Sequence, residues 1–349
     1  MKGSGPLSRM ITSPTDIAEL LAALGEPAFR IRQVHHWLYR RLAASFQEMT
    51  DLPKSLRNKL AEEAVLPNTR VLSRLGSADG TTKYSLALDD GSVIESVVIP
   101  MNGHFTLCLS SQTGCAVGCR FCVTGALGSG RNLRAHEIFA QFRVLMRDQG
   151  LLGKGVNVVF MGMGEPLLNF DEVVTSMALL GETVSLRRIT LSTAGIVPKL
   201  YELAKLARRP NLAVSLNATT DEQRAFLMPA ASRWQLQELL EALRAYPLER
   251  GRRITVEYVL IEDLNDSMAD ARRLVALLSG LRVKVNVIPL NPDPVYLPGL
   301  WPPPESVVTD FAGHLVAAGY SVTVRRSKGA DVAAACGQLR GQLLTKAKG

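Results

Sequence analysis

The hydrophobic pattern of the chain changes character twice along its length. Apolar residues first recur at the three- and four-residue spacing of amphipathic helices, and then alternate with polar residues as in strands. From Phe105 onward, short apolar runs are separated by helical stretches. The pattern therefore predicts a helical domain over residues 1–75, a β-hairpin over 76–104 and a larger α/β unit over 105–349 with a carboxyl-terminal tail.

The first part of the chain predicts a small helical domain. Helices are expected from Pro14 to Gly25, over residues 30–41, and from Pro53 through Leu60. Ser13 is placed to cap the first of these helices. Lys and Arg outnumber Asp and Glu by 11 to 7 in residues 1–75, which predicts a basic accessory domain that binds RNA, with His35, His36 and Trp37 among its cations. The alternative, equally supported, is a solvated helical domain with Trp37 in its core.

Strands dominate the pattern from residue 82. Two alternating segments, 82–88 and 92–100, flank the turn Asp89-Asp90-Gly91 and predict a hairpin. Parallel strands are predicted at Phe105–Ser110, Val156–Phe160, Ile189–Ser192, Asn211–Leu216, Ile254–Leu260 and Val283–Ile288, with a further edge strand at Val322–Arg325. Helices are expected around residues 135–148, 170–180, 198–208, 234–245, 267–279 and 305–318. Six parallel strands with crossover helices predict a partial (β/α) barrel, in which ligands bind at the carboxyl ends of the strands.

The composition narrows the class of protein. The 349 residues are 47% hydrophobic and 21% charged, as in an ordinary globular protein. No apolar run reaches the roughly 18 residues of a membrane span, and the start lacks the apolar segment of a signal peptide. Five cysteines, three of them clustered, do not resemble a secreted disulfide framework. We therefore expect a cytoplasmic protein without membrane contact. The net charge of +8 favours a polyanionic partner, although an ordinary basic enzyme is an equal alternative.

A cysteine motif carries the strongest chemical signal. Cys115, Cys119 and Cys122 follow a predicted strand at spacings of four and three. Thiolates are soft ligands, and no fourth cysteine lies nearby to close a structural zinc site. Three cysteines on a four-iron cluster leave one iron open to a further ligand, so the motif predicts a 4Fe-4S cluster. The alternatives are a zinc site closed by His136 or Cys108, or three unrelated buried cysteines.

Polar and glycine residues follow the predicted strands at the same edge. They are Gly164 and Glu165 in the loop Met161-Gly-Met-Gly-Glu-Pro166, Ser192, the run Ser215-Leu216-Asn217, and Asn291. Each is weak evidence alone, because polar residues are normal in loops. Together, at one edge and beside three cysteines, they predict a site for a cofactor that carries both an amino acid and an adenosine.

Three further residues remain ambiguous from the residues alone. Glu95 is the only charge in its strand, and either faces solvent or acts as a base near the cluster. Cys336 lies among alanines and Cys108 inside an alternating strand, where each would ordinarily be a small buried side chain.

Together these motifs resemble the radical S-adenosylmethionine (SAM) RNA methyltransferases of the RlmN/Cfr type. The resemblance runs from about Phe29 to Leu339. It rests on the cysteine motif with the preceding Ser-Ser-Gln-Thr-Gly, Gly162-Met-Gly-Glu-Pro-Leu-Leu-Asn169, Asn211-Leu-Ala-Val-Ser-Leu, Glu257-Tyr-Val-Leu, Asn265-Asp-Ser267 and Ala335-Cys336-Gly-Gln-Leu339.

The resemblance implies a role for each candidate residue. Cys115, Cys119 and Cys122 match the cluster ligands, and Gly164, Glu165, Ser192, Ser215, Leu216, Asn217 and Asn291 match SAM contacts. Cys336 matches the cysteine that carries the methyl group, Cys108 its partner in a transient disulfide, and Glu95 the proton acceptor. The implied fold is a radical-SAM barrel, and two SAM molecules are used per turnover, one as methyl donor and one as radical source.

The implied reaction is methylation of an adenine ring carbon. Such a carbon is electrophilic, so a methyl cation cannot be transferred to it by simple displacement, and this explains the need for a methyl carrier and a radical. We expect carbon 2 of an adenine in 23S ribosomal RNA, with transfer RNA as a second substrate. A flavodoxin or ferredoxin would donate electrons to a monomeric enzyme. Methylation at carbon 8, the antibiotic-resistance activity, is the alternative within the class, and a noncatalytic RNA-binding protein with a structural metal is the alternative outside it.

Three positions depart from the family's pattern. Asn217 stands where the family commonly has His, and Ala330 and Ala333 stand where it has acidic residues before Cys336. Asn217 can still hydrogen-bond a ribose. Ala330 and Ala333 lie close to Cys336 in the sequence, so they affect the prediction of the RNA target and of the carbon that is methylated.

Overall fold

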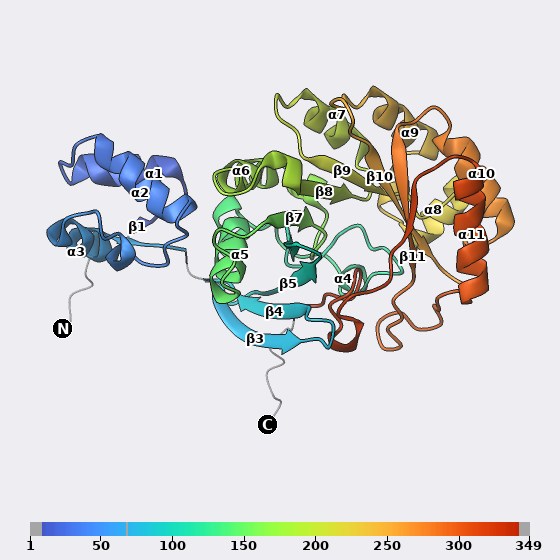
Figure 1. Ribbon diagram of the computed structural model, residues 1–349, viewed down its shortest axis with the longest axis horizontal. Coiled ribbons are helices and arrows are strands. Elements are labelled where there is room, and N and C mark those ends of the chain that lie inside the picture. The colour runs from blue at the N-terminus through green and yellow to red at the C-terminus, as the bar shows by residue number, and fades with distance from the viewer. Residues whose placement is uncertain (1–8, 68, 342–349) are drawn as a thin grey trace.

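The computed structural model describes residues 9–67 and 69–341. A small helical domain lies beside a large curved sheet covered by helices (Figure 1). The strands of the sheet are β3 (Arg70–Gly76), β4 (Thr82–Ala87), β5 (Val93–Met101), β6 (His104–Cys108), β7 (Val156–Phe160), β8 (Ile189–Thr193), β9 (Asn211–Ser215), β10 (Ile254–Leu260), β11 (Val283–Pro289) and β12 (Val322–Val324). They are ordered β12-β11-β10-β9-β8-β7-β6-β5-β4-β3.

The sheet has a parallel part and an antiparallel part. Strands β6 to β12 pair in parallel, each with its neighbour, which confirms the predicted partial barrel of six strands and the edge strand after it. Strands β3, β4 and β5 are antiparallel, and β5 pairs with β6. The hairpin therefore continues the barrel sheet, and β3, which the sequence pattern does not predict, forms its outer edge.

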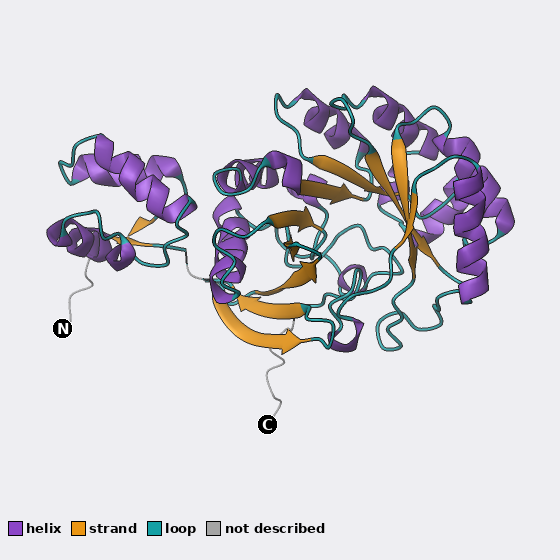
Figure 2. Ribbon diagram, viewed as in Figure 1, coloured by secondary structure: helices purple, strands orange, loops and turns teal. Residues whose placement is uncertain are grey.

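Helices cover the outside of the barrel strands (Figure 2). The predicted helices are confirmed as α5 (Ala135–Asp148), α6 (Phe170–Leu180), α7 (Val197–Lys205), α9 (Leu236–Ala245), α10 (Met268–Leu278) and α11 (Glu305–Ala317). Two short helices, α4 (Val123–Ala126) and α8 (Asp221–Leu227), were not expected. Short 3₁₀ turns occur at Phe46–Glu48, Pro166–Asn169, Leu186–Arg188, Ala231–Arg233 and Ala330–Val332. Within the described ranges, no helix is both long and apolar enough to span a bilayer.

The amino-terminal domain packs against the barrel through α5 and α6. Its elements are β1 (Arg9–Met10), α1 (Pro14–Ala23), α2 (Phe29–Tyr39), α3 (Lys54–Glu63) and β2 (Ala64–Val65), with β1 and β2 paired in parallel. Ser13 caps α1 in a capping box with Asp16. The ring of Tyr39 meets Phe139 edge-on, with centroids 5.2 Å apart, and Arg147 Nη1 donates to Leu42 O at 3.0 Å. The two parts therefore share one continuous apolar core.

The carboxyl-terminal tail crosses from the barrel to the hairpin. After β12, residues 325–341 run over the carboxyl ends of the strands, as the red segment in Figure 1 shows. On the hairpin side, Gly329 N donates to Asp79 Oδ2 at 3.0 Å and Lys83 Nζ donates to Ala333 O at 3.1 Å. On the barrel side, Val123 N donates to Gly337 O at 2.7 Å. The tail is thus held from both sides.

A buried arginine joins two loops at the carboxyl ends of the strands. Arg224, on α8, is fully buried; its Nη1 donates to Leu216 O at 2.9 Å and its Nη2 to Ala194 O at 2.5 Å. These carbonyls lie in the loops that follow β9 and β8. An apolar residue at this position would leave both carbonyls without this donor.

Replacing Arg224→Met should lower the free energy of unfolding by about 2–4 kcal/mol, because two buried acceptors lose their donor. Chemical denaturation followed by circular dichroism measures the change. The matched control is Arg233→Met, at an exposed position, for which we expect a change within about 0.5 kcal/mol. Equal stability of the two variants would contradict this role of Arg224.

Candidate active site

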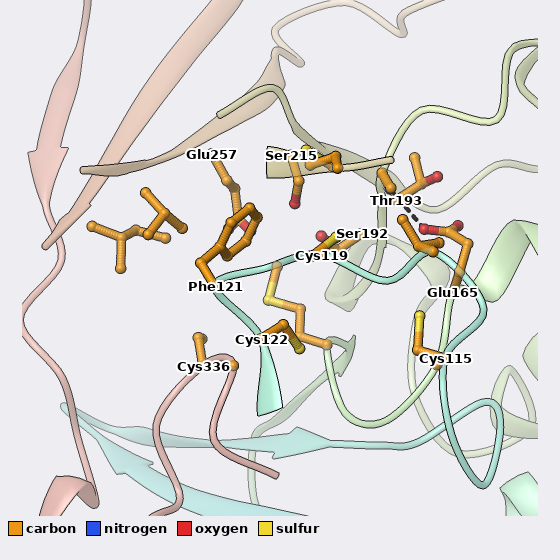
Figure 3. Close-up of a pocket in the computed structure, with 18 of the residues that line it drawn as sticks. Cys115, Cys119, Phe121, Cys122, Glu165, Ser192, Thr193, Ser215, Glu257 and Cys336 are labelled. Atoms are coloured by element: carbon orange, nitrogen blue, oxygen red, sulfur yellow. Dashed lines mark hydrogen bonds between the residues drawn. The ribbon is translucent and has the colours of Figure 1, made fainter. Parts of the chain in front are cut away.

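The three clustered cysteines lie in the loop between β6 and α4. Backbone hydrogen bonds shape this loop: Cys115 N donates to Gly128 O at 2.9 Å, and Cys122 N donates to Cys119 O at 3.2 Å. All three cysteines line one pocket, together with Phe121. Figure 3 shows the loop along this pocket, with the ring of Phe121 projecting into it. The sequence motif therefore becomes the wall of a single cavity, which we call the first pocket.

The chemistry of this wall fits an iron–sulfur cluster. Among the described residues, no three His, Cys, Asp or Glu side chains already surround one point as ligands of a single ion would. A four-iron cluster takes each thiolate at a different iron, so its cysteines line a cavity instead of meeting at a point. Burial raises the pKa of Cys115 to about 12 and that of Cys119 well above its usual value. Bound iron would favour their thiolate forms.

Five of the predicted cofactor contacts line the same pocket. They are Gly164, Glu165, Ser192, Ser215 and Asn291. They come from the carboxyl ends of β7, β8, β9 and β11, because neighbouring parallel strands end at the same edge of the sheet. Figure 3 shows Ser192, Ser215 and Glu165 on the side opposite the tail.

Glu165 organises two of these loops. Its Oε2 accepts from Ala194 N at 2.7 Å and its Oε1 from Leu167 N at 2.9 Å. Burial raises the pKa of this carboxyl group, and the two backbone amides oppose that shift. Glu165 therefore connects its own loop to the loop after β8 while it lines the pocket.

Leu216 and Asn217 do not line the first pocket, although Ser215 beside them does. Asn217 is fully buried, and its Oδ1 accepts from Val259 N at 2.9 Å. Its backbone is left-handed, with φ +54°, and its carbonyl accepts from Asn265 Nδ2 at 2.8 Å. The Asn217 side chain thus holds the strand ends together, and its expected contact with the ribose of SAM stays a prediction.

A second pocket lies between the barrel and the hairpin, and Cys336 lines both pockets. Cys108 lines the second pocket together with Val97 and Val159 of the neighbouring strands. Met161, Ile288 and Asn291 are shared by the two pockets, as Cys336 is. Burial raises the pKa of the Cys108 thiol to about 12. The two ambiguous cysteines are therefore brought to one cavity, 228 positions apart in the chain.

Glu95 lies beyond the second pocket, under the tail. Its side chain is 2% exposed, with Oε1 3.3 Å from Lys83 Nζ, and Oε2 accepts from Arg340 N at 2.8 Å. Glu95 is two residues from Val97 on β5, so both side chains face the same side of the sheet. It does not line either pocket. The burial of the Glu95–Lys83 ion pair contradicts the alternative in which Glu95 faces solvent.

Two charged residues near the pockets were assigned no role from the sequence, although Glu257 belongs to one of the motifs that carry the resemblance. Glu257 lines the first pocket from β10, and Arg325, directly after β12, lines the second. The signal available for Glu257 was one carboxylate inside an otherwise apolar or neutral strand, Ile254–Leu260. Arg325 had none, because basic residues after an edge strand are common.

Trp37 was expected either to contact RNA or to lie in the core of the amino-terminal domain. Trp37 is partly buried against the apolar core, and its Nε1 donates to Asp51 Oδ1 at 2.5 Å. His136, the alternative zinc ligand, lies on α5 beside the amino-terminal domain and away from the first pocket.

Known proteins share both parts of this architecture. Residues 109–275 match the radical SAM superfamily, and residues 12–66 match the ribosomal RNA large subunit methyltransferase N-terminal domain. The dual-specificity RNA methyltransferase RlmN of Syntrophotalea carbinolica is 48% identical over 94% of this chain and 88% of its own length. The protein of that name from Solidesulfovibrio magneticus is 45% identical, with 94% of each chain covered. The crystal structure of a radical SAM methyltransferase from Sphaerobacter thermophilus is 42% identical and superposes with a TM-score of 0.89, covering 95% of this chain and 98% of that one.

Gly164→Ala should weaken SAM binding by about tenfold or more, equivalent to about 1.4 kcal/mol. Gly164 has φ +98°, and an added Cβ would lie 2.5 Å from Gln112 Cβ and 2.8 Å from Gln112 N, so the loop must shift. Gly153→Ala is the matched control, since Gly153 has φ +79° but nothing within 4 Å of the added atom. Calorimetric titration of the cluster-loaded variants with SAM measures the difference, and equal affinity would contradict this account of the loop.

Proposed function

Because the chain belongs to the RlmN family of RNA methyltransferases, we propose that it methylates carbon 2 of an adenine in RNA through Cys336. The enzyme is a radical SAM methyltransferase. The observation that carries the proposed role of Cys336 is its position in the walls of both pockets. A sulfur atom there can receive a methyl group from one cavity and present it to a base in the other.

The cofactor site is the first pocket. Cys115, Cys119 and Cys122 would hold a 4Fe-4S cluster, and Gly164, Glu165, Ser192, Ser215 and Asn291 surround the space left for SAM. When bound, these groups supply the methyl group and the radical chemistry that makes its carbon reactive. Phe121 and the buried strand ends exclude water from that chemistry.

The tail holds Cys336 in place by its backbone. Asn291 Nδ2 donates to Cys336 O at 3.0 Å, and Ser327 Oγ donates to Asn291 Oδ1 in turn. Gly337 has φ +82°, and a side chain there would approach Phe121 O at 3.2 Å. Because these contacts use only the backbone of Cys336, its Sγ remains free to act as the nucleophile that accepts the methyl group.

The second pocket receives the adenine, which must be unpaired or turned out of its helix. Cys336 then carries the methylene carbon that bonds to the ring. The ring then loses one electron, which the cluster would take up, and one proton. Glu95 accepts that proton: Lys83 Nζ lies 3.3 Å from its Oε1, and its Oε2, which accepts from Arg340 N, is freed when the tail shifts at Arg340. Cys108 attacks Cys336 Sγ and releases the methylated RNA, leaving a disulfide.

The substrates follow from the relatives and the charge. The relatives' names state dual-specificity RNA methylation, so we assign 23S ribosomal RNA and transfer RNA. The net charge of +8 suits a polyanion. We also assign a flavodoxin or ferredoxin as electron donor, a monomeric state, and the cytoplasm, where thiols stay reduced.

Anaerobically reconstituted enzyme, incubated with SAM, a reductant and unmodified RNA, should produce 2-methyladenosine, identified by mass spectrometry of the digested nucleosides. Cys336→Ala should reduce the product below detection, because the methyl carrier is gone. Cys108→Ala should retain RNA covalently attached to the protein, since the thioether is not resolved.

The alternatives give different products in the same assay. Formation of 8-methyladenosine would show that the enzyme methylates carbon 8 of adenine. Normal methylation by Cys336→Ala would contradict the role of the tail. If an enzyme with an intact cluster cleaves SAM but forms no methylated nucleoside, the assignment of these RNAs as substrates is contradicted.

A further inference from the structure

An ion pair between the half-buried Arg325 and the buried Glu257 connects the walls of the two pockets. Arg325 Nη1, on the side of the second pocket, lies 3.8 Å from Glu257 Oε1, on the side of the first. The same nitrogen lies 3.9 Å from Met161 Sδ, and Met161 lines both pockets. No step assigned above uses this pair. Figure 3 shows Glu257 across the first pocket from Cys336.

The pair fixes the direction of the guanidinium. Glu257 is 6% exposed and its Oε1 has no hydrogen-bond partner, so a nearby cation offsets the cost of its burial. Arg325 N donates to Val287 O at 2.8 Å, which extends the β11–β12 pairing and gives the side chain a rigid base. At 3.8 Å the ion pair does not use the N–H donors of Arg325 fully. The guanidinium therefore retains donors for the second pocket.

Arg325 lines the second pocket together with Cys108 and Cys336. Of the other cations that line it in the described part of the chain, Arg326 pairs with Glu305 at 2.7 Å and Lys328 Nζ donates to Pro100 O at 2.9 Å. Charge interactions with Cys336, and less strongly with Glu257 and Cys108, raise the pKa of Arg325.

Cys108 needs such a cation to react as a nucleophile. Its side chain is 7% exposed, and the residues opposite it on the neighbouring strands are Val97 and Val159. Burial raises the pKa of the thiol, Cys336 adds to that rise, and Arg325 opposes it; Glu257 is the other charge that acts on it. The thiolate, not the thiol, attacks sulfur.

We propose that Arg325, oriented by Glu257, is a positioning residue that stabilises the Cys108 thiolate for its attack on Cys336. The inference rests on the proposed function. In this step a bond forms between Cys108 Sγ and Cys336 Sγ while the bond from Cys336 Sγ to the methylene carbon breaks. The electron pair passes to that carbon, which takes a proton and becomes the methyl group. The two cysteines are oxidised to the disulfide as the carbon is reduced, so no further oxidant is required.

Alkylation of the reduced holoenzyme with iodoacetamide tests the thiolate directly. Arg325→Gln should slow Cys108 alkylation about tenfold at each pH below the midpoint, which corresponds to a shift of the profile by about one pH unit. Arg325→Lys should recover part of the shift, and Arg326→Gln should leave the midpoint unchanged. Fragment mass spectrometry locates the label, and a Cys336→Ala background removes coupling between the two thiols. Arg325→Met gives the same comparison should the Gln variant lose its cluster absorbance.

The lifetime of the covalent protein–RNA adduct gives the second readout. Arg325→Gln should prolong it about tenfold at neutral pH and approach the wild-type lifetime as the pH rises, because thiolate then forms without the cation. An alkylation profile that coincides with wild type, or an adduct lifetime prolonged equally at every pH, would overturn the proposal. A wild-type enzyme that forms neither adduct nor methylated RNA would contradict the proposed function, while the alkylation profile still tests Arg325.

Discussion

The hydrogen bonds that hold the tail at Cys336 are the constraint on which the site depends. Asn291 and Val123 bind the carbonyls of Cys336 and Gly337 from the barrel side, and Lys83 binds Ala333 O from the hairpin side. These contacts fix the main chain on both sides of the sulfur without using the side chain. The wall between the two pockets therefore includes a thiol that is held in place and remains free to react.

Buried charges maintain the same geometry around the strand ends. Glu165 and Arg224 bind backbone groups of the loops after β7, β8 and β9, so each charge is partnered by the loops it positions, although Arg224 Nε has no hydrogen-bond partner. Glu257 and Arg325 pair with each other between the pockets. A charge taken from water is costly unless it is partnered, and here each partner is also a part of the site that must not move.

The sequence predicted most of the barrel and the composition of the first pocket, because parallel strands end at one edge and the cysteine spacing has few other uses. It did not predict β3, whose burial is too slight to give a clear alternation. It also did not show that the left-handed backbone of Asn217 turns the side-chain amide to Val259 N. Glu257 and Arg325 gain their meaning only when β10, β11 and β12 lie side by side, and a single sequence does not show which charges will meet.

The central claim is that the transferred carbon passes through the sulfur of Cys336, and an isotope measurement tests it most directly. The enzyme would be supplied with SAM that carries three deuterium atoms on its methyl group, and the methylated nucleoside would be weighed by mass spectrometry. Passage through Cys336 removes one of those atoms and adds another hydrogen when Cys108 releases the RNA, so the account predicts a product methyl group with two deuterium atoms. A methyl group that retains all three would show direct transfer and contradict the account.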